Sequence, residues 1–353
     1  MIDVMGKINK ESRILFLFPK PVKEELRQIE SGEAPSERLY GMYELMQDGY
    51  KVDYTDALYA GPLVQFYLFM KRCKIKWLPF TIFSKILRSD VVVIKDDFYT
   101  LAVLAARLTG KRVIYKDSIF LPPKKLVRKL HAFLNIALAD QVVAFSESQI
   151  ELWKSDFPRF AHKFRYIFYP LDKKFYQGNM IECDEKHTFI SVGRDVGRDN
   201  ATLHSCIGQL NQTLDLITLP YLISEKLKKD PRVRIHQYIS YQELFSIYGQ
   251  SYCSIVPLKK DISYPSGIRA IMESMALSVP VIAARTPVLE EYFEDGRDII
   301  YYDPENVDDL IDKVSGLMSG KYDVDALTKH AAQTMERYKI EPYAQEFLAI
   351  ISD

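Results

Sequence analysis

The chain has 353 residues, of which 48% are hydrophobic and 27% charged, and its formal net charge is zero. This length suits two domains, and the balanced charge gives no general attraction to nucleic acid. Four widely separated cysteines without a Cys-x-x-Cys pair argue against a disulfide framework or a metal site. The N-terminus does not resemble a signal peptide, and no apolar run reaches the roughly 20 residues of a membrane-spanning helix. We therefore expect a cytoplasmic protein.

Short apolar runs alternate with longer amphipathic segments in the first half of the chain. We expect buried strands at residues 13–18, 51–54, 91–94, 112–115 and 141–145. Helical periodicity falls at residues 36–47, where Ser36 is a candidate N-cap, and again at 99–108 and 124–138. Uniformly apolar strands separated by helices indicate a parallel sheet that is covered on both faces.

The same alternation starts again after residues 172–186, which are polar and aperiodic and are interpreted as a linker. We expect strands at 188–192, 215–218, 233–236, 253–257 and 279–283, and helices at 202–210, 223–228, 241–248, 267–277 and 307–318. The pattern predicts two Rossmann-like α/β domains, residues 1–175 and 176–335, facing each other across a cleft. Ligands bind at the carboxyl ends of such strands, so this cleft suits a reaction of two substrates.

The segment 263–284 combines a Pro-Ser-Gly turn, a helix and an apolar strand. Ser266, Gly267 and Ile268 at the helix start offer free backbone N–H groups and the positive end of the helix dipole, which suit a diphosphate. Glu273 follows on the same helix, where its carboxylate can accept two hydrogen bonds from a diol such as a ribose. A capped helix with a solvated glutamate is the alternative interpretation of these residues.

The segment 187–203, HTFISVGRDVGRDNATL, ends a predicted strand in Gly193-Arg194 and carries Arg198 before the next helix. An arginine at such a strand end suits a phosphate, because its guanidinium binds two oxygens at once. A pair of surface arginines is the alternative. Both segments follow strands of one predicted domain, which favours a shared phosphate site.

These segments resemble the GT-B glycosyltransferases of group 1, the large retaining type also called family 4. VGRDVGRDNATL is similar to the "VGR … KG … L" loop of that family, and SGIRAIMESMALSVPVIAARTPVLEEYFEDGRDIIYYDPENVDDL is similar to its E-x7-E donor region. In the first half, ADQVVAFSES and IFYPLDKKFY resemble further family segments. The resemblance implies an N-terminal acceptor-binding domain and a C-terminal donor-binding domain. It also implies a helix within residues 336–353 that crosses back to the first domain.

The resemblance also implies the roles of individual residues. The implied donor-binding set is Gly193, Arg194, Arg198, Tyr238, Ile239, Ser266, Gly267, Ile268 and Glu273. The two arginines and the helix start would hold the diphosphate, Glu273 the ribose, and Tyr238 and Ile239 would lie beside the base. Arg194, Arg198 and Asp117 would form the catalytic set. A loop-capping role for Asp117 is the alternative.

The leaving group of such a reaction is a nucleoside diphosphate, whose developing charge the two arginines and the helix dipole can stabilise. We therefore expect no metal and no cofactor beyond the nucleotide-sugar substrate. Retention of the anomeric configuration is the commoner outcome in the family. The first glutamate of its E-x7-E pair is replaced here, with Ser263-Tyr264-Pro265 near its place.

Basic and aromatic residues interleave at 62–88 and 120–131, a pattern that suits a shallow contact with anionic lipid at the inner face of the cytoplasmic membrane. Amphipathic helices with snorkelling lysines are the alternative. We predict a glycosyltransferase that moves a sugar from a UDP- or GDP-sugar to a glycan or lipid-linked acceptor, in bacterial polysaccharide or glycolipid synthesis. A sugar-nucleotide epimerase of the same fold and a non-catalytic two-domain sugar-binding sensor are the alternatives.

Overall fold

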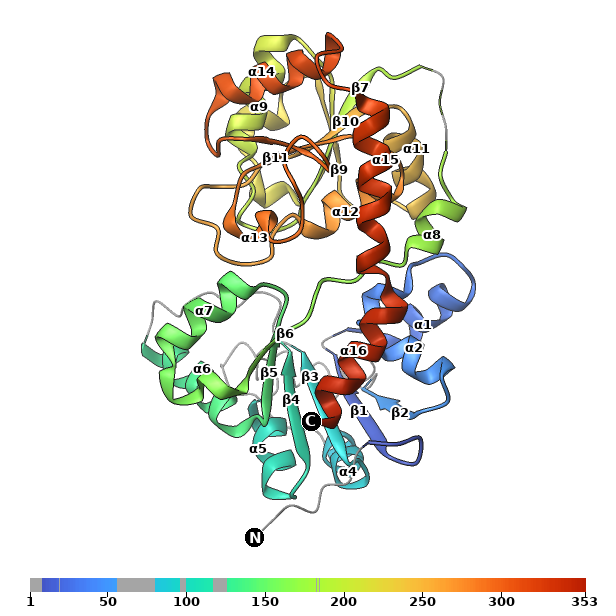
Figure 1. The fold of residues 1–353 in the computed structure, drawn as a ribbon, viewed down its shortest axis with the longest axis vertical. Coiled ribbons are helices and arrows are strands. Elements are labelled where there is room, and N and C mark those ends of the chain that lie inside the picture. Colours follow the sequence, from blue (N-terminus) through green and yellow to red (C-terminus); the bar gives the residue numbers. More distant parts are fainter. Residues whose placement is uncertain are drawn as a thin grey trace. The chain divides into compact units, whose positions relative to one another are not determined.

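The computed structural model describes residues 8–18, 20–55, 80–95, 100–116, 126–181, 183 and 185–353. These residues form two compact units, which are described separately (Figure 1). The first unit contains residues Met1–Pro170 and Ile340–Asp353, and the second contains Leu171–Lys339. The sequence analysis placed the two boundaries at residues 175 and 335.

The first unit is built on a parallel sheet of six strands in the order β2-β1-β3-β4-β5-β6. The strands are β1 (Arg13–Leu17), β2 (Lys51–Tyr54), β3 (Val91–Lys95), β4 (Arg112–Lys116), β5 (Gln141–Ala144) and β6 (Phe164–Tyr166). Its helices are α1 (Val22–Glu30), α2 (Met42–Gln47), α4 (Phe80–Arg88), α5 (Thr100–Leu108), α6 (Leu126–Leu138), α7 (Glu147–Asp156) and α16 (Ile340–Ser352), with short 3-10 turns η1 (Ser36–Leu39) and η4 (Pro158–Lys163).

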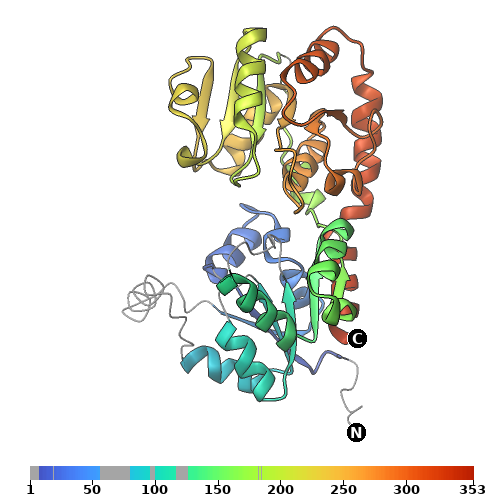
Figure 2. The same cartoon turned by 90° about the vertical axis from the view of Figure 1, so that its left-hand side faces the viewer.

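Each face of this sheet has its own hydrophobic core, because successive side chains of a strand point to opposite faces. Leu15 and Leu17 of β1 pack into the core that α4, α5, α6 and α7 cover. Ile14 and Phe16 pack into the other core, together with α1, α2 and the C-terminal helix α16. Figure 2 shows the red C-terminal end of the chain within the unit that holds its blue beginning.

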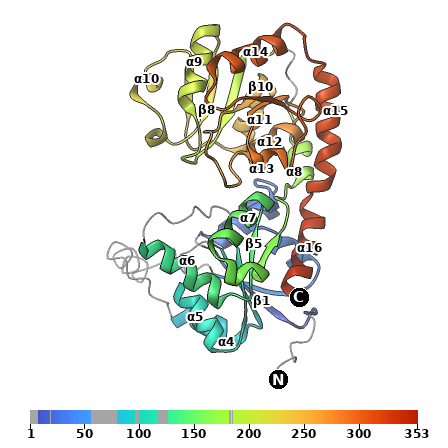
Figure 3. The same ribbon diagram turned by 60° about the vertical axis from the view of Figure 1, so that its left-hand side comes forward.

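The second unit repeats this architecture with the strand order β12-β11-β10-β7-β8-β9. Its strands are β7 (Thr188–Val192), β8 (Leu214–Ile217), β9 (Val233–His236), β10 (Ser251–Val256), β11 (Val281–Ala284) and β12 (Ile300–Tyr302). Its helices are α8 (Lys173–Gly178), α9 (Asn200–Leu210), α10 (Glu225–Lys228), α11 (Tyr241–Gly249), α12 (Ile268–Ala276), α13 (Pro287–Glu290), α14 (Val307–Met318) and α15 (Val324–Thr334), with 3-10 turns η5 (Pro220–Leu222) and η6 (Met335–Tyr338). Helices α9 and α14 lie side by side (Figure 3), whereas α12 packs against β10, β11, α8 and α15.

The fold-class prediction of two Rossmann-like α/β domains is confirmed, although several predicted elements differ from the structure. The single helix expected at residues 36–47 is interrupted, because Tyr40 and Gly41 have φ angles of 50° and 82°. The expected linker at 172–186 begins with α8, whose Tyr176 is fully buried. The linker was predicted from polarity alone, whereas one large buried aromatic ring anchors this otherwise polar segment. None of the helices in the described part of the chain is both long and apolar enough to span a bilayer.

Candidate functional site

The predicted phosphate site lies at the carboxyl edge of the second sheet, where two loops follow neighbouring strands. Strands β7 and β10 are hydrogen-bonded neighbours although some sixty residues separate them in sequence. One loop runs from Gly193 to Asp199 after β7, and the other leads from β10 to Gly267 at the start of α12. The pairing of these two strands therefore brings together the two segments that the sequence singled out.

Asp195 joins the two loops through its side chain. Its Oδ1 accepts hydrogen bonds from the backbone N–H of Gly197 and from the hydroxyl of Ser266, both at 2.9 Å. The hydroxyl of Tyr264 lies 3.4 Å from the same oxygen, and Oδ2 accepts from Nε of Arg198 at 3.2 Å. Burial, followed by the charge of Asp195, raises the pKa of Tyr264 to about 12, so this phenol remains a donor at neutral pH. Asp195 thus fixes both loops and orients Arg198.

Arg198 is buried, with 9% of its surface exposed, and it lies flat against Gly193. A Cβ at Gly193 would come within 2.1 Å of Nε of Arg198, so a larger residue there would displace the arginine side chain. The Nη1 group of Arg198 is buried and has no hydrogen-bond partner among the described residues. An unpaired buried guanidinium nitrogen is costly, which indicates that a ligand normally supplies its acceptor.

The start of α12 faces this unpaired nitrogen. Gly267 is the N-cap residue, with a φ of 86°, and it has no side chain to cap the first turn. The position of a Cβ on Gly267 lies 3.8 Å from Nη1 of Arg198 and 2.9 Å from Cγ1 of Val256. Ser266 and Ile268 flank it and are buried. Helix N-termini and arginines both favour anions, so this arrangement suits a phosphate or diphosphate.

The other predicted arginine, Arg194, belongs to a separate pair. Its Nη2 donates to the backbone oxygen of Gln237 at 2.5 Å, and its guanidinium lies 5.6 Å from the ring centre of Tyr238. Tyr238 is 82% exposed and Ile239 is partly buried, both in the loop after β9. An exposed aromatic ring beside a cation can stack against a planar ligand such as a nucleobase.

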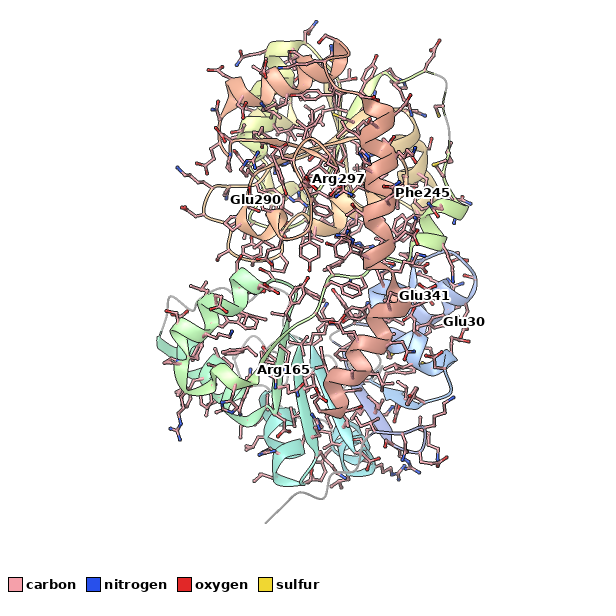
Figure 4. The ribbon with its side chains drawn as sticks, in the orientation of Figure 1. Glu30, Arg165, Phe245, Glu290, Arg297 and Glu341 are labelled. Carbon is pink, nitrogen blue, oxygen red and sulfur yellow. The ribbon has the colours of Figure 1, made fainter. Side chains whose placement is uncertain are left out.

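Glu273 belongs to a third group of contacts, and its side chain is buried rather than solvated. Its Oε1 accepts hydrogen bonds from the hydroxyl of Tyr176 at 2.9 Å and from Nε of Arg269 at 2.8 Å. Arg269 also donates to the hydroxyl of Tyr241 at 2.8 Å, and Phe245 packs on this group from α11 (Figure 4). The alternative of a solvated glutamate is therefore wrong, because α8 covers the carboxylate.

The structure thus brings Gly193, Arg198, Ser266, Gly267 and Ile268 together, and it leaves Arg194, Tyr238, Ile239 and Glu273 in separate contacts. The predicted catalytic Asp117 lies outside the described residues. Sequence reasoning missed Asp195, Tyr264, Tyr176 and Arg269. Asp195 carried a usable signal, because an aspartate two residues before a glycine often accepts a backbone N–H in a tight turn. Tyr176 carried none, since its partner Glu273 is 97 residues away along the chain.

The described part of the chain contains no group of three His, Cys, Asp or Glu side chains that could hold a metal ion. Cys183, Cys206 and Cys253 are free thiols. Burial raises the pKa of Cys206 to about 12, and burial likewise raises the pKa of Cys253. These two thiols therefore remain protonated and act as small apolar side chains.

Part of the second unit matches a known protein family. A family model described as "Glycosyl transferases group 1" matches residues 220–334, which include α12 and Glu273. No curated protein sequence matches the chain.

Solved structures of the same architecture match almost the whole chain. A glycosyltransferase from Rickettsia africae has a TM-score of 0.70 at 16% identity, covering 97% of this chain and 98% of its own. HepE from Anabaena, in complex with UDP-glucose, has a TM-score of 0.68 at 14% identity, covering 96% and 98%. A sucrose-phosphate synthase from Thermosynechococcus elongatus has a TM-score of 0.67 at 17% identity, covering 96% and 97%. The fold is therefore the two-domain GT-B fold.

Proposed function

We propose that the chain, which has the GT-B fold and matches the group 1 glycosyltransferase model over residues 220–334, moves a hexose from a UDP-sugar to a glycan or lipid-linked acceptor, with retention of configuration. The observation that carries this proposal is the buried Nη1 of Arg198, which faces the N-terminus of α12 and has no hydrogen-bond partner in the described part of the chain. We choose UDP over GDP because HepE, a protein of the same fold, has been solved with UDP-glucose and with UDP.

In the proposed reaction, the bond between the anomeric carbon and the diphosphate oxygen breaks, and the acceptor oxygen takes the place of the diphosphate. Negative charge grows on the leaving UDP, whose diphosphate oxygen takes the proton that the acceptor hydroxyl loses. Arg198 and the dipole of α12 stabilise that charge in a buried site, where such contacts act most strongly. We propose that these groups act without a metal ion, and that Asp195 keeps Arg198 in position.

The remaining predicted residues extend this donor site. Arg194, Tyr238 and Ile239 would lie along the nucleoside, with the exposed ring of Tyr238 stacked on the base. Glu273 would bind the ribose through Oε2, because Oε1 already accepts hydrogen bonds from Tyr176 and Arg269. Asp117 would face the acceptor or the donor sugar.

The first unit is the proposed acceptor unit, placed at the inner face of the cytoplasmic membrane in a bacterial polysaccharide or glycolipid pathway. The segments proposed for membrane contact, 62–88 and 120–131, lie largely outside the described residues. Exposed leucines on the neighbouring helices support the proposal: Leu87 on α4, Leu101, Leu104 and Leu108 on α5, and Leu130 and Leu134 on α6. Exposed apolar side chains on three neighbouring helices suit a contact with lipid.

Isothermal calorimetry with UDP, GDP and ADP tests the donor site. Arg198→Met should weaken UDP binding by about tenfold to a hundredfold, because a hydrogen bond to a charged group contributes roughly 1.5–3 kcal/mol. Arg297→Met is the matched control, since Arg297 pairs with Glu294 at the surface of the same unit (Figure 4). Equal UDP affinity in wild type and Arg198→Met would refute the site. Interconversion of a UDP-sugar without an acceptor would instead favour the epimerase, and binding without turnover the sensor.

A further inference from the structure

A cluster of four cationic side chains at the carboxyl edge of the first sheet has no role in the donor site. Lys95 ends β3 and Lys116 ends β4, and the two are register partners on neighbouring parallel strands. Register partners point to the same face of a sheet, so two like charges lie side by side, which is destabilising. Lys20 and Arg38 complete the cluster, in the segments that follow β1.

Lys116 is buried, and its ammonium lies among aromatic side chains. Its exposed fraction is 2%, and its Nζ has no hydrogen-bond partner among the described residues. Four aromatic rings surround this Nζ, with ring centres of Tyr40 and Tyr343 at 4.5 Å and those of Phe145 and Phe347 at 4.9 Å. Burial, followed by the charge of Lys95, holds the pKa of Lys116 well below its usual value. The aromatic rings stabilise the ammonium through their faces but supply no negative charge.

Lys95 lies beside the same aromatic ring and lacks a carboxylate partner among the described residues. Its Nζ is 4.2 Å from the ring centre of Tyr40 and donates to the Tyr40 hydroxyl at 3.0 Å. Tyr40 adopts a left-handed backbone with a φ of 50°, which a bulky side chain seldom does. Strain of this kind persists where the surrounding structure requires it, and it gathers at functional sites. Here it holds one ring against both lysines.

The positive charge of the cluster exceeds the negative charge that the described residues bring to it. Glu25 accepts hydrogen bonds from Lys20 at 3.3 Å and from Arg38, and it is the one carboxylate in the described ranges that contacts any of the four cations. The pKa of Lys20 is lowered to about 8, chiefly by burial and also by the charges of Lys95 and Arg38, whereas Glu25 opposes this shift. Among the described residues, Glu25 therefore supplies the one counter-charge in contact with this cluster.

We propose that Lys20 and Lys95, which lie beside the buried Lys116, bind an anionic oxygen group of the acceptor, either a phosphate or a carboxylate. Lys20 and Lys95 are partly exposed and can donate to such a group directly. Lys116 acts through its position next to Lys95 and remains in its aromatic surroundings. Parallel sheets bind ligands at this edge, which is where an acceptor would be held. The assignment of the anion to the acceptor rests on the proposed function, whereas the anion site itself does not.

Calorimetric titration of the full-length protein with inorganic phosphate at low ionic strength tests the site, with UDP present to occupy the donor site. Lys95→Met and Lys20→Met should each weaken phosphate binding by about tenfold, because each removes one charge-assisted contact. Lys95→Arg, which keeps the charge, should bind phosphate nearly as the wild type does. Circular dichroism and UDP affinity confirm that each variant is folded.

Lys51→Met is the matched control. Lys51 lies at the opposite edge of the same sheet and lines a basic cavity of about 280 Å³ with Arg13, Lys85 and Arg88. Phosphate affinity that is unchanged in Lys95→Met and Lys20→Met, or lost in Lys51→Met alone, would overturn the proposal. A parallel titration with acetate identifies the group, since tighter phosphate binding assigns a phosphorylated acceptor and tighter acetate binding a carboxylate.

The two proposals fail in distinguishable ways. If the chain does not bind UDP, the phosphate titration is repeated with Arg198→Met, in which the second unit has lost its anion site. If phosphate binding in this variant depends on Lys95, the anion site is supported and only the donor-site proposal is refuted. UDP binding that depends on Arg198, combined with phosphate binding independent of Lys20 and Lys95, rejects only the anion site.

Discussion

The substitution Gly267→Ala tests whether close packing at the start of α12 is required for nucleotide binding. Gly267 has a φ of 86°, a left-handed conformation in which a Cβ costs about 1–2 kcal/mol. The added Cβ would also lie 2.9 Å from Cγ1 of Val256, and overpacking of this kind costs about 1–3 kcal/mol. We therefore expect Gly267→Ala to lower the free energy of unfolding of the second unit by about 2–5 kcal/mol.

Gly296→Ala is the control for backbone strain alone. Gly296 has a φ of 71°, and no atom lies within 4 Å of the position its Cβ would take. This variant should lose only about 1–2 kcal/mol, so the difference between the two variants measures the packing cost. Urea unfolding followed by far-UV circular dichroism gives both values. Fluorescence of Trp77 and Trp153 reports on the first unit, which contains both tryptophans, and should be unchanged.

The same pair of variants separates ligand binding from stability. The Cβ position on Gly267 lies 3.8 Å from Nη1 of Arg198, so the methyl group intrudes where the diphosphate is proposed to bind. UDP affinity, measured by calorimetry well below the unfolding temperature, should fall at least about tenfold in Gly267→Ala and stay unchanged in Gly296→Ala. Equal affinity and equal stability in the two variants would refute both the packing argument and the position of the donor site.

Three further predictions concern side chains away from the ligand. Asp195 is not proposed to contact UDP, but Asp195→Asn should weaken UDP binding by about tenfold, because Arg198 loses its charged partner. Unchanged UDP affinity in calorimetry would mean that Asp195 only shapes the loop. Tyr176→Phe should cost about 0.5–1.5 kcal/mol of stability by removing a hydrogen bond to Glu273, and an unchanged thermal midpoint would contradict that bond. Burial alone would raise the pKa of Asp215, but hydrogen bonds from Arg234, His236 and Thr188 lower it, so Asp215 stabilises the fold above about pH 4 and loses this effect as the pH falls further. The stability difference between wild type and Asp215→Asn should therefore shrink between pH 7 and pH 3, and a constant difference would refute the linkage.

Much of the fold was predictable because its signals are local. The run RILFLF is apolar throughout and becomes β1, with Ile14 and Phe16 in one core and Leu15 and Leu17 in the other. Such runs predicted two parallel sheets, and the structure confirms them. The wrong predictions fell where one or two residues determine the local structure against the pattern of the surrounding sequence. Tyr176 anchors a helix in a polar stretch, and the left-handed Tyr40 and Gly41 divide an amphipathic one.

The candidate site was predictable in part. Its glycines and arginines stand in short motifs, so Gly193, Arg198 and Gly267 could be named from spacing and chemistry. The sequence favoured a phosphate site shared by the two segments, but it could not show which arginine lies beside Gly267, since Arg194 and Arg198 look alike in sequence. Only the structure shows that Arg194 turns to Gln237 and Tyr238, whereas Arg198 lies buried beside Gly267.

By itself, the sequence determined the kinds of element and the chemistry available at their ends, because hydrophobic period and turn residues act over a few positions. Tertiary structure alone decided which ends meet. The pairing of β7 with β10 joins Asp195 to Ser266, and the pairing of β3 with β4 sets Lys95 beside Lys116. Strand order depends on how whole sheet faces pack against helices that lie far along the chain. A local sequence pattern does not contain this information.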